Sequence, residues 1–236
     1  HNYIILHLNF SNVITDQTKT ELINSFDNIV VSGVKNCLRK YNDIFEGKQL
    51  PKEESKATYA LDFLVSEAEF QEKKIFLFID EYDNFANNIM SPRRKMYEEL
   101  VHQDGYVRTF YKGIKKGTAK GVISRIFITG VSPIMLDDIT SGASILTAAA
   151  NDEDLNSMLG FTENEVKELI NYYQIEDIVD KSELGTILQN YCNGYKFNEE
   201  TEETMYNTDM VLYIIKNIVQ TGRFPKKLVD ENIKTD

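Results

Sequence analysis

The sequence predicts an α/β fold, in which helices cover both faces of a parallel sheet and a small helical subdomain follows. Three short apolar runs, at residues 3–10, 75–79 and 122–129, have the composition of buried strands. Helical patterns separate these runs, and such strand–helix alternation is typical of a parallel sheet. After residue 155 the strands stop and short capped helices follow. We therefore expect an α/β core over residues 1–155 and a helical subdomain over 156–236.

Composition indicates a folded, soluble protein. A length of 236 residues with 42% hydrophobic content is enough for a substantial core. The net charge of −11 disfavours general binding to nucleic acid or anionic membranes, although Arg93, Arg94 and Lys95 form a local basic patch. We find neither an apolar run near the ~18 residues of a membrane span nor a leader pattern. Cys37 and Cys192 are far apart, which favours free thiols and a cytoplasmic location.

The first half of the core contains two predicted helices. Thr18 and Glu21 have the spacing of a capping box, and apolar residues at helical spacing continue one long helix to Phe45. A polar loop over residues 47–56 separates it from a second amphipathic helix that begins at Ala57.

Two further helices are predicted between the second and third strands. Ser91 and Pro92 resemble an N-cap followed by proline at the first helical position, and this helix continues to Val101. Another helix is predicted over residues 106–115. The glycine- and lysine-rich stretch over 113–121 is predicted to be a loop.

The C-terminal part has clear helix start and stop signals. Residues 162–165 read as a capping box, with Phe161 and Val166 placed as its hydrophobic staple. Two further helices are predicted, one ending at Asn193-Gly194 and one over residues 211–219 ending before Gly222.

Two acidic residues follow the second strand directly. In open α/β sheets ligands bind beyond the carboxyl ends of the strands, which is where Asp80 and Glu81 are predicted to lie. The first carboxylate is suited to hold Mg²⁺, and its neighbour to polarise the water that attacks a γ-phosphate. The competing interpretation is that polar residues simply end a strand at the surface.

A polar residue also ends the third strand. Thr129 is predicted at the tip of a strand next to the acidic one, from which it could reach the same phosphate or water. Turn chemistry before Gly130 explains a threonine there equally well, and Ser132 is open to the same two interpretations.

Other common site patterns are missing from this sequence. A phosphate-binding loop would read G-x-x-x-x-G-K-[ST] between a strand and a helix, and no such run occurs. The stretches Gly113 to Gly117 and Gly47-Lys48 lack its spacing or ending, and we interpret both as ordinary loops. The three histidines and two cysteines show neither metal-ligand spacing nor a catalytic dyad.

Five segments, in order along nearly the whole chain, resemble the predicted AAA-ATPase-like family. They are residues 5–11, 78–83, 127–132, 160–166 and 191–197. The resemblance implies a P-loop NTPase fold: a three-layer parallel sheet of the additional-strand type, here without its first strand and phosphate loop. Family members often carry a PD-(D/E)XK nuclease-like domain downstream. Thr208-Asp209 departs from the family pattern, which usually has proline and a bulky residue there.

The resemblance also implies roles for individual residues and two cofactors, ATP and Mg²⁺. Asp80 would be the Walker B magnesium ligand and Glu81 the catalytic glutamate. Asp83 would be a further acid of the nucleotide site, and Thr129 a sensor at the end of the fourth strand. An arginine finger could come from Arg93, Arg94, Arg125 or a neighbouring subunit.

The implied function is an ATPase module that binds and hydrolyses Mg-ATP in the intact protein, driving a conformational change in a partner or effector domain. The alternative is an interaction or regulatory module that keeps the fold without nucleotide turnover, which the absent loop favours for this chain alone. A third interpretation is the regulatory part of a nuclease system, acting on DNA only through another domain. We expect a protein partner or a homo-oligomer, and no membrane contact.

Overall fold

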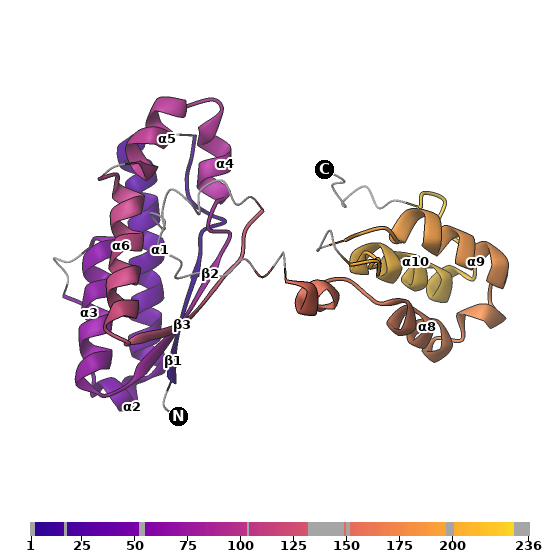
Figure 1. Ribbon diagram of the computed structural model, residues 1–236, viewed down its shortest axis with the longest axis horizontal. Helices are drawn as coiled ribbons and strands as arrows, with labels where there is room; N and C mark the ends of the chain where they lie inside the picture. Colours follow the sequence, from indigo (N-terminus) through magenta and orange to yellow (C-terminus); the bar gives the residue numbers. More distant parts are fainter. Residues whose placement is uncertain are drawn as a thin grey trace. The chain divides into compact units, whose positions relative to one another are not determined.

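The computed structural model describes residues 3–16, 18–51, 55–102, 104–131, 149, 152–196 and 201–228. The chain forms two compact units, His1–Leu146 and Thr147–Asp236 (Figure 1). Each unit has a hydrophobic core of its own. Ser132 lies outside the described residues.

Unit 1 contains a parallel three-stranded sheet, as the sequence predicts. The strands are β1 (Tyr3–Asn9), β2 (Lys74–Asp80) and β3 (Ile123–Ile128), in the order β1-β2-β3. Both pairings are parallel, and the register between β2 and β3 shifts between Ile75 and Phe76. The middle strand β2 therefore places its carboxyl end between those of its two neighbours.

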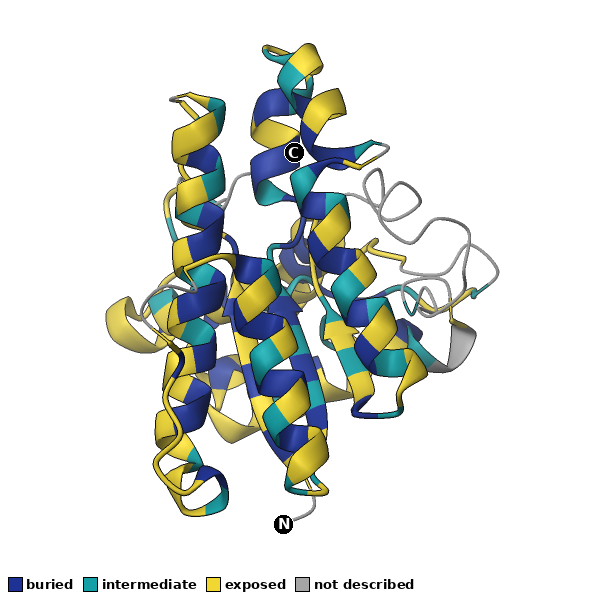
Figure 2. Ribbon diagram, turned by 90° about the vertical axis from the view of Figure 1, so that its left-hand side faces the viewer, coloured by how far each residue is buried: buried dark blue, intermediate teal, exposed yellow. Residues whose placement is uncertain are grey.

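The helices of unit 1 pack against one face of this sheet. The buried side chains of β1 and β2 alternate with less buried ones, and Figure 2 shows similar alternation along the helices. On the opposite face Tyr3, Ile5 and Phe127 are 42%, 40% and 44% exposed. The sequence predicts helices on both faces, whereas the described helices α1, α3 and α6 lie on the same side (Figure 1). Because β2 is apolar on both faces, its sequence does not indicate which face of the sheet the helices of this chain cover.

Six helices of unit 1 are described. They are α1 (Lys19–Lys40), α2 (Asn42–Phe45), α3 (Ala57–Phe70), α4 (Asn84–Met90), α5 (Arg94–Val101) and α6 (Tyr106–Ala119). The predicted capping box of α1 is confirmed, since Thr18 Oγ1 accepts from the Glu21 amide and the Glu21 side chain accepts from Thr18. The long first helix breaks at Tyr41, so α2 is separate from α1.

Two helix boundaries differ from the prediction. Ser91 and Pro92 do not start a helix: Ser91 is the C-cap of α4, and α5 begins only at Arg94. The stretch from Gly113 onward is not a loop, because α6 continues to Ala119. A Cβ at Gly117 would lie 2.6 Å from Ile123 Cδ1, so this glycine allows α6 to approach β3 closely. Glycine therefore marks close packing here, and not a turn.

Unit 2 is a small helical unit. Among its described residues are the 3₁₀ helices η3 (Glu153–Met158) and η4 (Ile175–Asp177), the α-helices α8 (Glu163–Tyr172), α9 (Lys181–Ile187) and α10 (Thr208–Thr221), and the π-helical turn η5 (Leu188–Cys192). The predicted stop at Gly222 is confirmed, with this residue in the left-handed conformation at the C-cap of α10. Asn207 caps the start of α10 by accepting from the Met210 amide, directly before Thr208-Asp209, the pair that departs from the family pattern.

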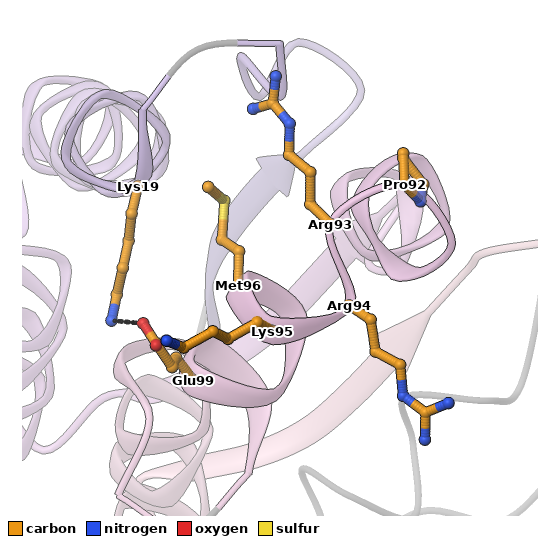
Figure 3. Close-up of a pocket in the computed structure, with 7 residues that line it drawn as sticks. All are labelled: Lys19, Pro92, Arg93, Arg94, Lys95, Met96 and Glu99. Carbon is orange, nitrogen blue, oxygen red and sulfur yellow. Dashed lines mark hydrogen bonds and ion pairs between the residues drawn. The ribbon is translucent and has the colours of Figure 1, made fainter.

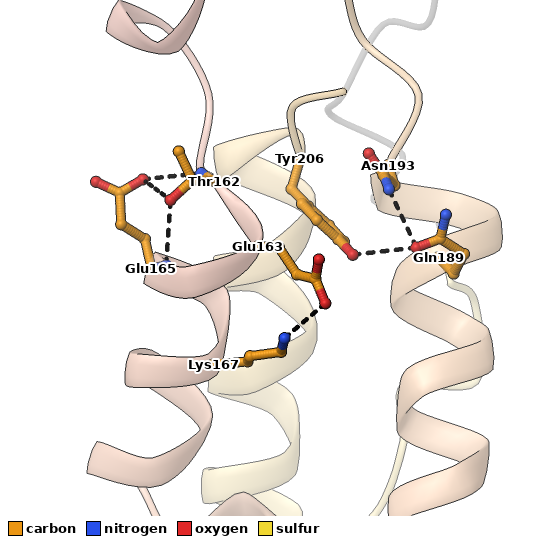
Figure 4. A network of polar contacts seen from close by, with 7 residues as sticks. All are labelled: Thr162, Glu163, Glu165, Lys167, Gln189, Asn193 and Tyr206. Carbon is orange, nitrogen blue, oxygen red and sulfur yellow. Dashed lines mark hydrogen bonds and ion pairs between the residues drawn. The ribbon is translucent and has the colours of Figure 1, made fainter. Parts of the chain in front are cut away.

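Figure 4 shows two sets of polar side-chain contacts in unit 2, one at the start of α8 and one around Gln189. The predicted capping box between Thr162 and Glu165 starts α8. The Tyr206 hydroxyl donates to Gln189 Oε1 at 3.1 Å, and Asn193 Nδ2 donates to the same oxygen at 3.0 Å. Burial raises the pKa of Tyr206. These contacts hold η5 against the segment before α10, which is a structural role.

None of the described helices is long and apolar enough to cross a membrane. Cys37 and Cys192 are both buried and free. Burial raises the pKa of the Cys37 thiol to about 12 and that of Cys192 to about 11, so both are neutral and protected at physiological pH.

Candidate functional site

A row of three polar residues crosses the carboxyl edge of the sheet. Asn9 is the last residue of β1 and pairs in register with Asp80, the last residue of β2. Thr129 directly follows β3, and its amide donates to the Ile79 carbonyl at 2.9 Å. Because side chains alternate along a strand, register places all three on the sheet face opposite α1, α3 and α6.

The Asp80 carboxylate is held from both sides of this row. Asn9 Nδ2 donates to Asp80 Oδ2 at 2.9 Å, and the Thr129 hydroxyl donates to Asp80 Oδ1 at 2.5 Å. Asp80 is half-buried, whereas Asn9 and Thr129 are exposed. The two predicted residues Asp80 and Thr129 are thus in direct contact. Asn9 is not among the site residues that the sequence predicts, although its place at the end of β1 is the same as that of Asp80 at the end of β2.

Glu81 makes the turn between β2 and α4. Its φ is 55°, in the left-handed region that residues with a side chain rarely adopt. Its carbonyl accepts from the Asn84 amide at 3.1 Å, and its carboxylate oxygen Oε2 accepts from Asn84 Nδ2 at 3.1 Å. The strand therefore ends abruptly after Asp80. Strained backbone of this kind is often found at functional sites.

Asp83 is buried, with only 1% of its surface exposed. Its Oδ2 accepts from the Nδ2 atom of Asn87 at 2.8 Å, and Asn87 lies on the first turn of α4. Its Oδ1 accepts from the Val131 amide at 3.2 Å, in the segment after β3. The carboxylate thus joins the segments that follow two neighbouring strands, and it faces the protein interior.

The three arginines considered as arginine fingers lie in different places. Arg93 donates to the backbone carbonyls of Thr15 and Asp16, at 3.0 and 2.6 Å. Arg94 is largely exposed and pairs with Glu98 at 3.0 Å. Arg125 lies on β3 opposite Phe76, four residues before Thr129 and so roughly 13 Å along the strand from it.

A hollow of about 540 Å³ lies beside the start of α5, lined by Lys19, Pro92, Arg93, Arg94, Lys95, Met96 and Glu99 (Figure 3). Its cationic side chains do not converge. Arg93 and Arg94 point away from each other in the figure, and Lys19 forms an ion pair with Glu99 at 2.8 Å. The hollow therefore contains contacts that tie α1 and α5 together, and shows no prepared anion site.

The edge of the sheet suits a hard cation better than a soft one. Asp80 and Thr129 present carboxylate and hydroxyl oxygens, which are ligand types that Mg²⁺ accepts, whereas Asn9 turns its NH₂ group to Asp80 and its Oδ1 accepts from the Ser11 amide at 2.8 Å. No group of three or more His, Cys, Asp or Glu residues that could hold a metal occurs in the described part of the chain. That finding is compatible with Mg²⁺, which is usually bound through one or two carboxylates, water and substrate phosphates.

These features define an α/β protein with a candidate ligand site at the carboxyl edge of a parallel sheet, where Asp80 ends the middle strand and Glu81 follows it. The family model described as Predicted AAA-ATPase matches residues 1–140, which include all four predicted site residues. The chain belongs to this predicted AAA-ATPase-like family. No match was found among curated proteins or among solved structures.

Proposed function

We propose that the full-length protein binds and hydrolyses Mg-ATP and uses hydrolysis to drive a conformational change in a partner or effector domain. The observation that carries this proposal is the Asp80 carboxylate, which Asn9 and Thr129 hold at the end of the middle strand with Glu81 directly after it. Membership in the predicted AAA-ATPase-like family supports the same reaction class.

Asp80 is the proposed magnesium ligand. Mg²⁺ would neutralise charge on the phosphates during transfer. Both Asp80 oxygens already accept one hydrogen bond, and each keeps lone-pair capacity for a further contact. The carboxylate is thereby oriented before any ligand arrives, which lowers the entropy lost on binding.

Glu81 is the proposed residue that polarises the attacking water. Its carboxylate accepts a hydrogen bond from the neutral side-chain amide of Asn84, which orients a carboxylate without neutralising it. A carboxylate that keeps its charge can accept a proton from water or align it for attack. Thr129 is the proposed sensor residue. Its hydroxyl contacts Asp80, and from there it would contact the same phosphate or water as the two acids.

The test is ATP binding and turnover by the full-length protein and by Glu81→Gln. Glutamine keeps the size and the Asn84 contact but removes the charge. We expect binding to persist while kcat falls about 10²- to 10⁴-fold, the range typical of a lost general base. Glu72→Gln is the matched control, because Glu72 has nearly the same left-handed backbone, with φ 53° against 55°, and is exposed. Unchanged turnover in Glu81→Gln would remove Glu81 from the mechanism.

The competing function is an interaction or regulatory module without turnover. The observation that favours it is the lack of a G-x-x-x-x-G-K-[ST] run in this sequence, since such a loop wraps the phosphates of ATP. The same binding experiment separates the two proposals. Failure of the full-length protein to bind ATP with Mg²⁺ at millimolar concentration favours the module without turnover.

A further inference from the structure

Two backbone hydrogen bonds and one side-chain hydrogen bond fix the segment after β3 against the end of β2 and the segment that follows it. The Thr129 amide donates to the Ile79 carbonyl at 2.9 Å, and the Thr129 carbonyl accepts from the Tyr82 amide at 3.1 Å. Two residues later, the Val131 amide donates to the buried Asp83 carboxylate. Thr129 is therefore fixed on both sides by the chain that carries Asp80 and Glu81.

Gly130 lets the two segments approach this closely. A Cβ added at Gly130 would lie 2.3 Å from Tyr82 Cε1 and 2.4 Å from Asp83 Oδ1. Both distances are far below van der Waals contact, so any larger residue would push Val131 away from Asp83. The φ of Gly130 is not in the left-handed region, so the requirement for glycine arises from the contact.

We propose that Asp83 is a positioning residue, whose buried carboxylate holds the Gly130–Val131 segment against α4 and thereby keeps the Thr129 hydroxyl on Asp80. The proposal rests on the proposed function, because it assigns Asp83 a task in the same site. The proposal also gives the three acids different roles. Asp80 and Glu81 face the ligand. Asp83 acts on them through Thr129 and touches neither metal nor nucleotide.

A carboxylate is the side chain that this position requires. Two partners of the Asp83 carboxylate, the Val131 amide and the Asn87 side-chain amide, are donors, and they bind different oxygens. Asparagine offers one acceptor oxygen and would turn an NH₂ group toward the other donor. Of these two contacts, Asp83→Asn should therefore keep one, whereas Asp83→Ala should lose both.

The first test measures hydrogen exchange of the Val131 amide, and it needs no nucleotide. We expect Asp83→Ala to speed this exchange at least about tenfold, with a smaller effect in Asp83→Asn. Tyr111→Phe is the control. The Tyr111 hydroxyl is buried close to Asp83, yet it has no hydrogen-bond partner in the described part of the chain.

The exchange experiment can overturn the contact itself. Unchanged exchange at Val131 in both Asp83 variants would do so, as would an equal effect in Tyr111→Phe, which would indicate general loosening. Should Asp83→Ala fail to fold, Asp83→Asn decides the same question, because it preserves volume and one hydrogen bond.

The second test is a double-mutant cycle read out by Mg-ATP binding and turnover of the full-length protein. If Asp83 acts through Thr129, Asp83→Asn lowers kcat with little change in KM in the wild-type background, and has no added effect in Thr129→Ala. In Asn9→Ala its effect persists, because Asn9 contacts Asp80 from the other strand.

Equal effects of Asp83→Asn in both backgrounds would overturn the role through Thr129. A protein that binds no ATP would instead contradict the proposed function, and the exchange of Val131 would still show whether Asp83 holds this segment. The two failures are therefore distinguishable.

Discussion

Asn9 and Asp80 lie opposite each other at the carboxyl ends of β1 and β2, and the Asn9 amide donates to the Asp80 carboxylate at 2.9 Å. The orientation of the proposed magnesium ligand is therefore set partly by the neighbouring strand. Cross-strand pairs of this kind depend on register, and a shift by one residue would turn Asn9 to the other face. The site is thus a property of the sheet as well as of the segment after β2.

Replacing Asn9 by aspartate should make the stability of unit 1 depend on Mg²⁺. Asn9→Asp places two carboxylates directly opposite each other, which costs roughly 0.2–1 kcal/mol in the absence of a cation. A divalent cation bound between them should recover that loss. Urea unfolding with Mg²⁺ and with EDTA measures the difference, and Asn9→Ala is the control that loses the hydrogen bond without adding charge. Equal unfolding of Asn9→Asp under both conditions would argue against a cation at this edge.

Replacing Glu81 by glycine should stabilise the protein and abolish hydrolysis. Glycine adopts a φ of 55° without the clash of a Cβ, so we expect a gain of about 0.5–1 kcal/mol. Glu72→Gly, at a φ of 53°, should give a similar gain with unchanged turnover. Thermal unfolding and an ATPase assay on both variants check this. If Glu81→Gly destabilises while Glu72→Gly stabilises, the Asn84 contact of Glu81 outweighs its backbone strain.

Asp27 is a buried acid that stabilises the packing of three helices. It lies on α1 and is 7% exposed; its Oδ1 accepts from the Ala57 amide at 2.6 Å and from the Tyr106 hydroxyl. Since Lys56 provides no side-chain cap, Asp27 caps α3 from a neighbouring helix. Asp27→Ala leaves both buried donors unpaired and should cost about 1–3 kcal/mol.

The Asp27 prediction has a spectroscopic check. Burial, and secondly the Asp27 contact, raise the pKa of Tyr106 well above its usual value. An ultraviolet titration should therefore show this pKa falling partway toward normal in Asp27→Ala. Asp27→Asn keeps an acceptor oxygen and should lose less stability. A loss in Asp27→Asn as large as that in Asp27→Ala would show that the charge matters more than the two hydrogen bonds.

Sequence patterns predicted the parts of the fold that depend on local chemistry. Both capping boxes are confirmed, at Thr18 and at Thr162, because a cap involves residues only three positions apart. The β2 strand was equally clear, as its apolar run ends abruptly at Asp80. Thr129 and Asp80 lie at the ends of β3 and β2, so their contact can be expected as soon as these two strands are predicted to be neighbours.

Features that depend on contacts between distant segments could not be predicted in this way. The pattern Gly113 to Gly121 reads as a loop, yet Gly117 is a packing position against Ile123 of β3. Asn9 lies opposite Asp80 because β1 and β2 pair in this register, and the sequence alone does not reveal the register. The Asp83 carboxylate accepts a hydrogen bond from the Val131 amide, 48 residues further along the chain.

Thr162 offers a test of unit 2 that is independent of the nucleotide site. Its Oγ1 accepts from the Glu165 amide at 3.2 Å, and the Glu165 side chain accepts from the Thr162 amide at 2.8 Å, so the two residues cap α8 together. Thr162→Ala should cost unit 2 about 1 kcal/mol at pH 7. Hydrogen exchange of the α8 amides measures this loss within the full chain, and Thr162→Ser, which keeps the hydroxyl, should show little of it.

The loss should also depend on pH. The hydrogen bonds from the Thr162 backbone and side chain lower the pKa of Glu165 below its usual 4.5. A carboxyl group whose pKa is lowered by folding stabilises the folded state above its unfolded pKa, and that contribution disappears as pH falls through the folded pKa. The difference between wild type and Thr162→Ala should therefore be largest above pH 4.5 and should shrink below it. Because the Thr162 amide, the larger cause of this lowered pKa, remains in Thr162→Ala, a difference that stays constant down to about pH 3 would show that the bond between the Thr162 hydroxyl and the Glu165 carboxylate adds nothing to the cap.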